Sequence, residues 1–206
     1  MSLLAKFIIF IIIIVFSVKN LFAADIPIIV IAPSKKAQSI STVGSTTTVF
    51  DESSINNTND FFLGDVLGNR TTSFNFFQTG GHGTNSGIQL RGLPKRYTTV
   101  YIDGVKMSDP SSPSNDFYFD HILKNQISRV EILKGNQSSV YGSGAIGGTI
   151  NITTKKGKPG FQKDISYNTA SHGTHNLAFS LSGADEKNDF YFGLSTGRKL
   201  FPVLLF

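Results

Sequence analysis

The chain contains no cysteine and no tryptophan, and only 16% of its 206 residues are charged. Without cysteine there can be no disulfide, no thiolate nucleophile and no cysteine-ligated metal, so the fold must rest on a packed core or on a partner. No basic stripe with interleaved aromatic residues is present, which argues against nucleic acid as a partner. What the chain does have is 20 glycines, 18 phenylalanines and many small polar residues, a composition typical of an exported β-rich protein.

The first 24 residues have the parts of a secretory signal peptide. A short basic start ends at Lys6, an isoleucine-rich apolar run covers residues 7–16, and small residues close the segment. A membrane anchor is the alternative, but polar residues interrupt the run well short of the roughly 20 apolar residues that a spanning helix needs. We therefore predict cleavage of residues 1–24. Loss of Lys6 and Lys19 lowers the formal charge from +5 to +3. The basic pI is therefore only a mild bias and no argument for nucleic acid as a partner.

An apolar, β-branched segment, residues 25–31, comes directly after the predicted signal peptide. Pro27 removes a backbone donor and confines any pairing of this segment to the edge of a sheet. The segment can add as a strand to the sheet of another protein, or it can be the first strand of this domain. The residues alone leave both alternatives open.

Residues 46–158 predict a small α+β domain that ends near Lys158. Alternating apolar residues predict strands over 46–50, 73–77, 88–90, 100–105 and 130–133. Helical spacing predicts short helices over 51–55 and 58–67, the second capped by Thr58 or Asn59, and a helical turn over 122–127. The mixture of short helices and strands favours an α+β domain.

A glycine-rich turn precedes the last predicted strand of this domain. Gly142, Gly144 and Gly147 match the dinucleotide fingerprint G-x-G-x-x-G, which requires a strand before it and a helix after it. The residues after Gly148 instead alternate with period two and are β-branched, so they predict a strand. The turn therefore does not indicate a nucleotide site.

No group of residues in the sequence indicates catalysis or a resident cofactor. No nucleophile, base and orienting group are arranged for an enzyme mechanism. His82 stands alone in a glycine loop, and no histidine has partners at metal-ligand spacing. We expect neither an enzyme nor a metal centre. Asp103 and Gly104 are a strong turn signal.

Three amphipathic segments of about ten residues come after Pro159. Their apolar residues alternate with small or polar ones around Ile165, Phe179 and Phe192. Alternation of this length in an exported chain resembles the start of an outer-membrane β-barrel, with apolar side chains towards lipid. A soluble meander is the alternative, and periodicity alone favours it.

Four motifs in order resemble the plug domain of TonB-dependent outer-membrane receptors. They are Leu-Arg-Gly at 90–92, Val-Tyr-Ile-Asp-Gly at 100–104, Arg-Val-Glu-Ile-Leu-Lys-Gly at 129–135 and the turn and strand at 140–152. The resemblance, strongest to cobalamin and siderophore receptors, covers residues 25–158. It implies an α+β plug, a small mixed β-sheet with short helices, followed by the first antiparallel strands of an incomplete transmembrane β-barrel. The implied divisions are a signal peptide at 1–24, a TonB-box-like segment at 25–31, a plug at 32–158, barrel strands at 159–198 and an irregular, truncated end at 199–206.

The resemblance also implies partners and roles for individual residues. The periplasmic domain of TonB would pair with the terminal segment, through Asp25, Ile26, Pro27, Ile28, Ile29 and Val30. Arg91 and Lys134 would pair with carboxylates of the barrel wall, although a lysine lacks the two-pronged geometry of an arginine. The outward loops, residues 79–86 and 107–115, would contact the ligand, through Gly81, His82, Asn85, Ser108, Asp109 and Ser114. The structural turns would depend on Gly92, Asp103, Gly104, Gly142, Gly144, Gly147 and Gly148.

The expected function is therefore that of the N-terminal part of a receptor in the outer membrane of a Gram-negative bacterium. Such a receptor takes up a metal chelate, as siderophore-bound iron, or cobalamin, and its plug gates the barrel. At roughly 20 residues per strand and turn, a barrel of about 22 strands needs about 400 more residues than this chain holds, so we expect a truncated chain. The alternative is a stand-alone periplasmic plug-like module that binds a ligand or protein and transports nothing.

Overall fold

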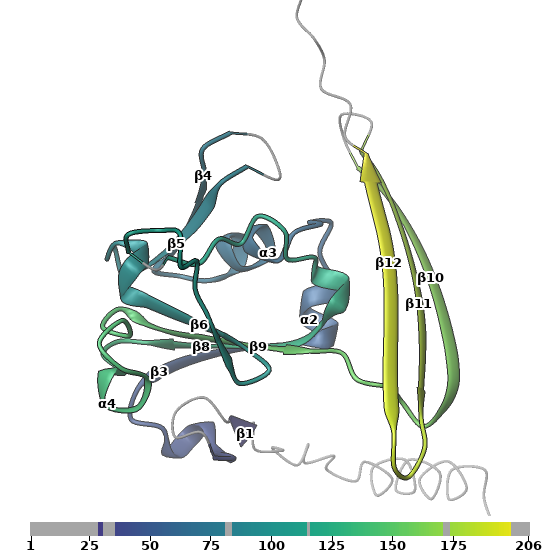
Figure 1. Cartoon of the computed structure of the whole chain (residues 1–206), viewed down its shortest axis with the longest axis horizontal. Coiled ribbons are helices and arrows are strands. Elements are labelled where there is room, and N and C mark those ends of the chain that lie inside the picture. The colour runs from purple at the N-terminus through teal and green to yellow at the C-terminus, as the bar shows by residue number, and fades with distance from the viewer. Residues whose placement is uncertain (1–28, 31–35, 81–83, 115, 171–173, 199–206) are drawn as a thin grey trace, which may run out of the picture.

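A five-stranded mixed sheet is the centre of the N-terminal domain in the computed structural model, which describes residues 29–30, 36–80, 84–114, 116–170 and 174–198 (Figure 1). The strands lie in the order β3-β8-β9-β6-β7. Their bounds are β3 Thr46–Asp51, β6 Thr98–Ile102, β7 Val105–Met107, β8 Ile127–Lys134 and β9 Gly148–Thr154. All neighbours are antiparallel except β6 and β9, which run parallel. The predicted α+β fold with a small mixed sheet is confirmed.

Two short helices, α2 (Glu52–Asn56) and α3 (Leu63–Arg70), lie on one side of the sheet (Figure 1). The sequence predicted the second helix over 58–67 with a cap at Thr58 or Asn59, and this boundary is wrong. Phe62 forms an antiparallel bridge with Leu123, and the Leu63 N–H donates to the Ile122 carbonyl at 2.9 Å. This tertiary pairing keeps Phe62 itself in an extended conformation, with φ of -93° and ψ of 143°, so the helix begins after it.

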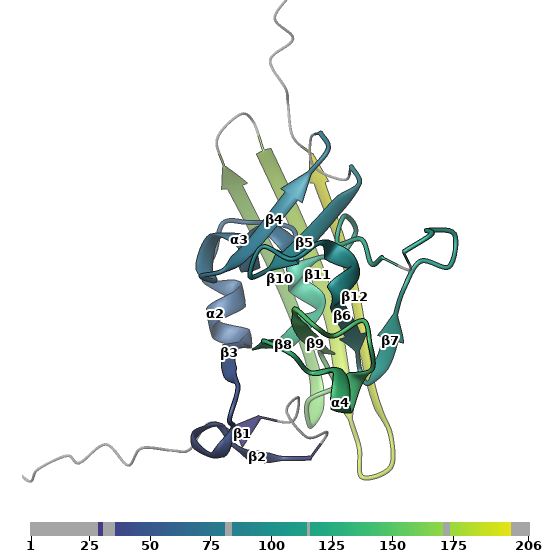
Figure 2. The same cartoon turned by 90° about the vertical axis from the view of Figure 1, so that its left-hand side faces the viewer.

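The remaining elements of the domain connect or cover the sheet. Strands β4 (Phe74–Gln78) and β5 (Ser86–Leu90) form a hairpin beside α3. The 3-10 helices η2 (Lys95–Tyr97) and η3 (Lys124–Gln126) precede β6 and β8, and η3 confirms the predicted helical turn. Helix α4 (Ser138–Tyr141), which the sequence did not predict, leads into the glycine-rich turn. Strands β1 (Ile29–Val30) and β2 (Gln38–Ser39) pair before η1 (Ile40–Thr42), at the end of the domain opposite the β4–β5 hairpin (Figures 1 and 2).

One hydrophobic core lies between the sheet, the helices and the hairpin. Its fully buried members include Ile55 of α2, Leu67 of α3, Leu90 of β5, Ile132 of β8 and Ile150 of β9. The period-two apolar positions of β8 and β9 supply the sheet side of this core, as their alternation predicts. The core holds together the elements that carry the predicted ligand loops and the turns.

Three long antiparallel strands stand beside the domain: β10 (Gly160–Ala170), β11 (Thr174–Ala184) and β12 (Asp189–Arg198). We call these three the wall strands, and Figure 2 shows them behind the domain along its height. Their apolar residues face outward, as Ile165, Phe192 and Leu194 show with 70%, 55% and 63% of their surfaces exposed. The three strands predicted after Pro159 are confirmed.

In the described ranges no helix is both long enough and apolar enough to span a membrane. The predicted signal peptide, the segment 25–28 and the segment 199–206 lie outside the described residues.

Candidate functional site

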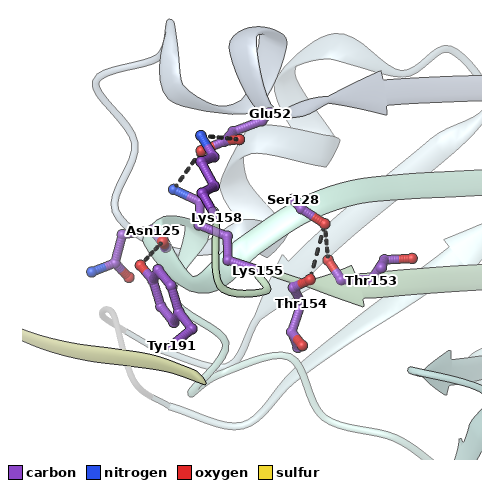
Figure 3. A network of polar contacts seen from close by, with 8 residues as sticks. All are labelled: Glu52, Asn125, Ser128, Thr153, Thr154, Lys155, Lys158 and Tyr191. Atoms are coloured by element: carbon purple, nitrogen blue, oxygen red, sulfur yellow. Dashed lines mark hydrogen bonds and ion pairs between the residues drawn. The ribbon is translucent and has the colours of Figure 1, made fainter. Parts of the chain in front are cut away.

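The linker from β9 to the wall strands is tied to the domain by charge (Figure 3). Glu52, the first residue of α2, forms ion pairs with Lys155 at 3.0 Å and with Lys158 at 3.7 Å. The Lys155 N–H also donates to the Gln126 carbonyl at 2.9 Å. The chain is therefore held against the domain immediately before the first wall strand begins at Gly160.

The wall strands meet the domain through polar groups. The Tyr191 hydroxyl of β12 donates to the Asn125 carbonyl of η3 at 3.2 Å (Figure 3). A cavity of about 290 Å³ lies between the two parts, and residues from both line it, among them Lys124, Asn125, Asp164, Ser166, Asn176 and Tyr191. Hydrogen bonds of this kind can be exchanged for water, whereas a closely packed apolar interface cannot. The interface therefore fits a domain that is seated against a wall yet separable from it.

Arg91 and Lys134, the predicted latch residues, lie close together at the end of β8. Arg91 has a φ of 56°. Its guanidinium lies beside Gly135, where an added Cβ would be 3.2 Å from Nη1 of Arg91. The buried Lys134 donates from Nζ to the Thr72 carbonyl at 2.7 Å, and burial lowers its pKa. Within the described ranges neither residue has an ion pair with a carboxylate. Their pairing with carboxylates of a barrel wall stays a prediction.

The predicted turn at Asp103–Gly104 connects β6 to β7. Both residues have positive φ values, 48° and 82°, as a two-residue hairpin turn of type I′ requires. The Asp103 carboxylate also accepts hydrogen bonds from the N–H and the hydroxyl of Thr154, at 2.9 and 2.6 Å. The turn therefore joins the end of β6 to the end of β9.

The glycine-rich turn leads into strand β9, as predicted. Its Gly147 N–H donates to the Tyr97 carbonyl at 2.9 Å, and the Gly147 carbonyl accepts from Gly135 at 3.0 Å. At Gly148, with φ of 150°, a Cβ would lie 2.2 Å from the Leu133 carbonyl oxygen. The glycines let three backbone segments approach one another. This close packing accounts for them without a phosphate.

The two predicted ligand loops, 79–86 and 107–115, differ in how far the structure describes them. Gly81 and His82 lie outside the described residues. The Asn85 carbonyl accepts hydrogen bonds from the N–H and the hydroxyl of Thr79, at 3.0 and 3.2 Å. Ser108 and Ser114 are exposed.

Asp109 orders the start of the second loop. Its carboxylate accepts hydrogen bonds from the hydroxyl and N–H of Ser111 at 2.6 and 2.9 Å, and these bonds lower the pKa of Asp109. The Asp109 N–H donates to the Asp116 carbonyl at 2.8 Å, which brings the two ends of the loop together. The closed base therefore supports Ser114 within the loop, and Ser108 lies directly before the base.

A charged cluster that the sequence did not predict lies at the base of both loops. Lys95 of η2 forms an ion pair with Asp116 at 3.1 Å, and its ammonium lies 4.2 Å from the centre of the Tyr118 ring. Hydrogen bonds with Asn85, Lys95 and Ser112 lower the pKa of Tyr118. Lys95 and Asp116 are 21 positions apart, and no local pattern signals their contact.

The two residues described from the TonB-box-like segment pair with the chain itself. Ile29 and Val30 form β1, which pairs with Ser39 and Gln38 of β2, and Val30 is fully buried. Asp25, Ile26, Pro27 and Ile28 lie outside the described residues. Pairing of this segment with TonB stays a prediction.

The described residues contain no group of three or more metal-ligating side chains. His121 pairs with Asp120 at 3.1 Å, and His175 bonds and stacks with Tyr167 across two wall strands. Both histidines therefore have ordinary structural partners.

Comparison with known families matches residues 39–149 to the model described as the TonB-dependent receptor plug domain. This chain belongs to the TonB-dependent receptor plug family. A curated relative, the vitamin B12 transporter BtuB of Vibrio vulnificus (strain CMCP6), is 30% identical over 156 residues, which are 76% of this chain and 25% of the relative. The chain thus spans about a quarter of the length of this relative.

Solved structures of TonB-dependent receptors share the fold. The ferric yersiniabactin uptake receptor FyuA from Yersinia pestis superimposes with a TM-score of 0.57 at 24% identity, over 77% of this chain and 24% of that receptor. FpvA of P. aeruginosa, solved with heterologous pyoverdines bound, gives a TM-score of 0.62 at 18% identity, over 75% of this chain and 20% of that receptor. At these identities the likeness concerns the fold alone. The plug fold with the first wall strands after it is thereby confirmed.

Proposed function

We propose that this chain supplies the plug and first wall strands of a TonB-dependent outer-membrane receptor for the uptake of a metal chelate or cobalamin. The observation that carries the proposal is the plug match over residues 39–149, followed directly by strands with a polar face towards the plug and an apolar face outward. Such alternation is what a strand between lipid and a polar lumen requires. The relative is a vitamin B12 transporter and the structural neighbours are siderophore receptors, which supports both classes of ligand.

In this arrangement the hairpin end of the domain, with loops 79–86 and 107–115, faces the outside and contributes to ligand binding. The opposite end, with β1, faces the periplasm. Residues 25–30 pair with the periplasmic domain of TonB by strand addition, which needs only backbone donors and acceptors. The plug gates the barrel because its contacts to the wall are polar and can be replaced by water.

Cysteine trapping tests the proposal cleanly because the chain has no cysteine of its own. Single cysteines are placed at each of residues 25–30 of the full chain, in cells whose TonB carries one cysteine in its periplasmic domain. We expect a disulfide-linked complex from this segment in the outer-membrane fraction. Ser111→Cys, an exposed site at the opposite end, serves as the control and should give no complex.

Two results would contradict the proposal. Absence of a complex from all six positions would remove TonB as the partner. Recovery of the chain as a soluble periplasmic protein that binds cyanocobalamin or ferric enterobactin would instead support a stand-alone binding module.

A further inference from the structure

We propose that Lys95 is a charge clamp that holds the two outward loops at a fixed spacing. The clamp consists of Lys95 with Asp116 and Tyr118, and it joins η2 to the loop between β7 and η3. No single element of secondary structure contains the cluster, so its side chains are what keep the loops together. The outward, ligand-facing position of these loops rests on the proposed function, whereas the clamp itself does not.

Asp116 is a buried carboxylate that pairs with a cationic side chain. Its side chain is only 7% exposed, and one carboxylate oxygen, Oδ2, lies 3.1 Å from Lys95 Nζ and 3.4 Å from the Ser112 hydroxyl. Its other oxygen, Oδ1, is buried and has no hydrogen-bond partner among the described residues. A buried carboxylate that loses its cation is strongly disfavoured. Lys95 is therefore the main partner that makes burial of Asp116 tolerable.

Lys95 reaches Asp116 by passing over β5 at Gly87. A Cβ at Gly87 would lie 3.1 Å from Cδ of Lys95 and 2.6 Å from the Phe77 ring. The absence of a side chain at Gly87 thus opens the route for the lysine stem between the hairpin and η2. A glycine in a strand commonly marks such a close approach.

The first loop is attached to the same cluster. Tyr118 lies under the Lys95 ammonium and bonds with the Asn85 side chain, and the Asn85 carbonyl holds Thr79 at the other end of the loop. In addition, the Ser86 hydroxyl accepts a hydrogen bond from the Phe119 N–H at 3.0 Å. Both loops are therefore fixed against one strip of chain, residues 116–119, with Lys95 as its only cation among the described residues.

The clamp also connects the loops to the centre of the sheet. Lys95 is the first residue of η2, and β6 begins directly after η2 at Thr98. The Tyr97 carbonyl at the end of η2 accepts the Gly147 N–H of the glycine-rich turn. Lys95 therefore lies in the element that is bonded to this turn.

The spacing of the two loops can be measured without any ligand. In the full chain in detergent micelles, spin labels on Gly80→Cys and Ser114→Cys report the distance between the loops by pulsed electron paramagnetic resonance. Both positions are exposed, and the chain has no other cysteine to label. We expect one narrow distance peak for the labelled chain and its loss, with a broad distribution, in Lys95→Met.

Three further variants separate the clamp from a general loss of structure. Lys106→Met, an exposed lysine on β7, should keep the narrow peak, and Lys95→Arg should restore it. The exchange Lys95→Asp with Asp116→Lys should recover more of the peak than either single change, because only the pair restores opposite charges. A narrow peak in Lys95→Met, or a charge exchange no better than the single changes, would overturn the proposal.

A failed clamp and a failed receptor function give different results. If the peak broadens in Lys95→Met but no TonB complex forms, the clamp stands and the proposed function falls. If the TonB complex forms but the peak stays narrow in Lys95→Met, the proposed function stands and the clamp falls.

Discussion

At the residue scale, backbone conformation and close approach decide which side chains are possible. Arg91 and Asp103 adopt positive φ values without being glycine, and the next residue in each case is a glycine that also has a positive φ. Asp103 compensates with hydrogen bonds to Thr154, and aspartate tolerates this conformation better than most residues. Gly148 is more demanding, because space as well as conformation excludes a side chain there.

We expect Gly148→Ala to lower the free energy of unfolding by about 3 kcal/mol, since the methyl group must displace the Leu133 carbonyl. Gly104→Ala is the matched control. Its φ is also positive, 82° against 150° at Gly148, but a Cβ there would have no atom within 4 Å, so about 1 kcal/mol should be lost. Urea unfolding monitored by tyrosine fluorescence measures both, because the chain has six tyrosines and no tryptophan. Equal losses would show that the contact with Leu133 is unimportant.

A second residue-scale prediction concerns Asp51, which caps α2. The hydroxyl and N–H of Ser54 and the hydroxyl of Ser53 bond to its carboxylate and lower its pKa below the ordinary 3.8. A carboxyl group with a lowered folded-state pKa stabilises the fold above its unfolded value and loses that contribution as pH falls through the folded value. Asp51→Ala should therefore cost about 1 kcal/mol of unfolding free energy at pH 7 and less below pH 3.8.

The comparison is made by urea unfolding at neutral and acid pH. Asp51→Asn keeps an acceptor for the cap but cannot titrate, so its stability relative to wild type should improve as the pH falls. An Asp51→Ala penalty that is the same at both pH values would count against the charged cap.

At the element scale, tertiary contacts set boundaries that local pattern could not. The late start of α3 results from the bridge between Phe62 and Leu123, two residues 61 positions apart. Strands with a strict alternation, such as β9 and the wall strands, were predicted well because their pattern reflects which face is buried. Helix α4 was not predicted because four residues carry too little periodicity.

The contact between β12 and η3 gives an element-scale prediction. Tyr191→Phe removes the hydroxyl that donates to the Asn125 carbonyl, while the ring remains. We expect the weakened contact to cost about 1 kcal/mol, which corresponds to roughly fivefold faster amide exchange around residues 124–126. Hydrogen exchange measured by mass spectrometry on the full chain reports this directly. Tyr167→Phe removes a hydroxyl on the outward face and should leave that exchange unchanged, and a similar effect from both variants would contradict the assignment.

At the scale of the whole molecule, the chain combines a domain with a hydrophobic core and a sheet whose apolar face is exposed. The wall strands present residues such as Ile165 and Leu194 outward, away from the plug. Large exposed apolar faces are unusual on soluble proteins and mark surfaces that contact a partner or lipid. Under the proposed function this face contacts lipid, because its apolar residues alternate along the strands with the polar residues that line the cavity beside the plug.

We expect Leu194→Arg, near the middle of β12, to weaken association with phospholipid vesicles, because an arginine on the lipid face costs about 2 to 4 kcal/mol of free energy at the middle of the bilayer. The control is Asn188→Arg, which adds the same charge in the turn between β11 and β12. It should leave the vesicle-bound fraction nearly unchanged. Vesicle flotation of the full chain measures the bound fraction. Unchanged flotation of the Leu194 variant would indicate that this face does not contact lipid.

The fold class, most of the strands and the resemblance to the family could all be predicted from the amino-acid sequence. Alternation, turn residues and the four ordered motifs are local features, and each is written in adjacent residues. The sequence also placed Asp103, Gly104 and the glycines of the turn, whose roles depend on backbone conformation.

The contacts between residues far apart in the chain could not be predicted and are seen only in the folded protein. The ion pairs of Glu52 with the linker, the contact of Tyr191 with Asn125, and the Lys95 cluster all join residues far apart in the chain. The bond from Lys134 to the Thr72 carbonyl likewise joins residues 62 positions apart. Single ionic and polar residues carry no periodic signal, so their partners are set by how the sheet and hairpin pack and not by spacing along the chain.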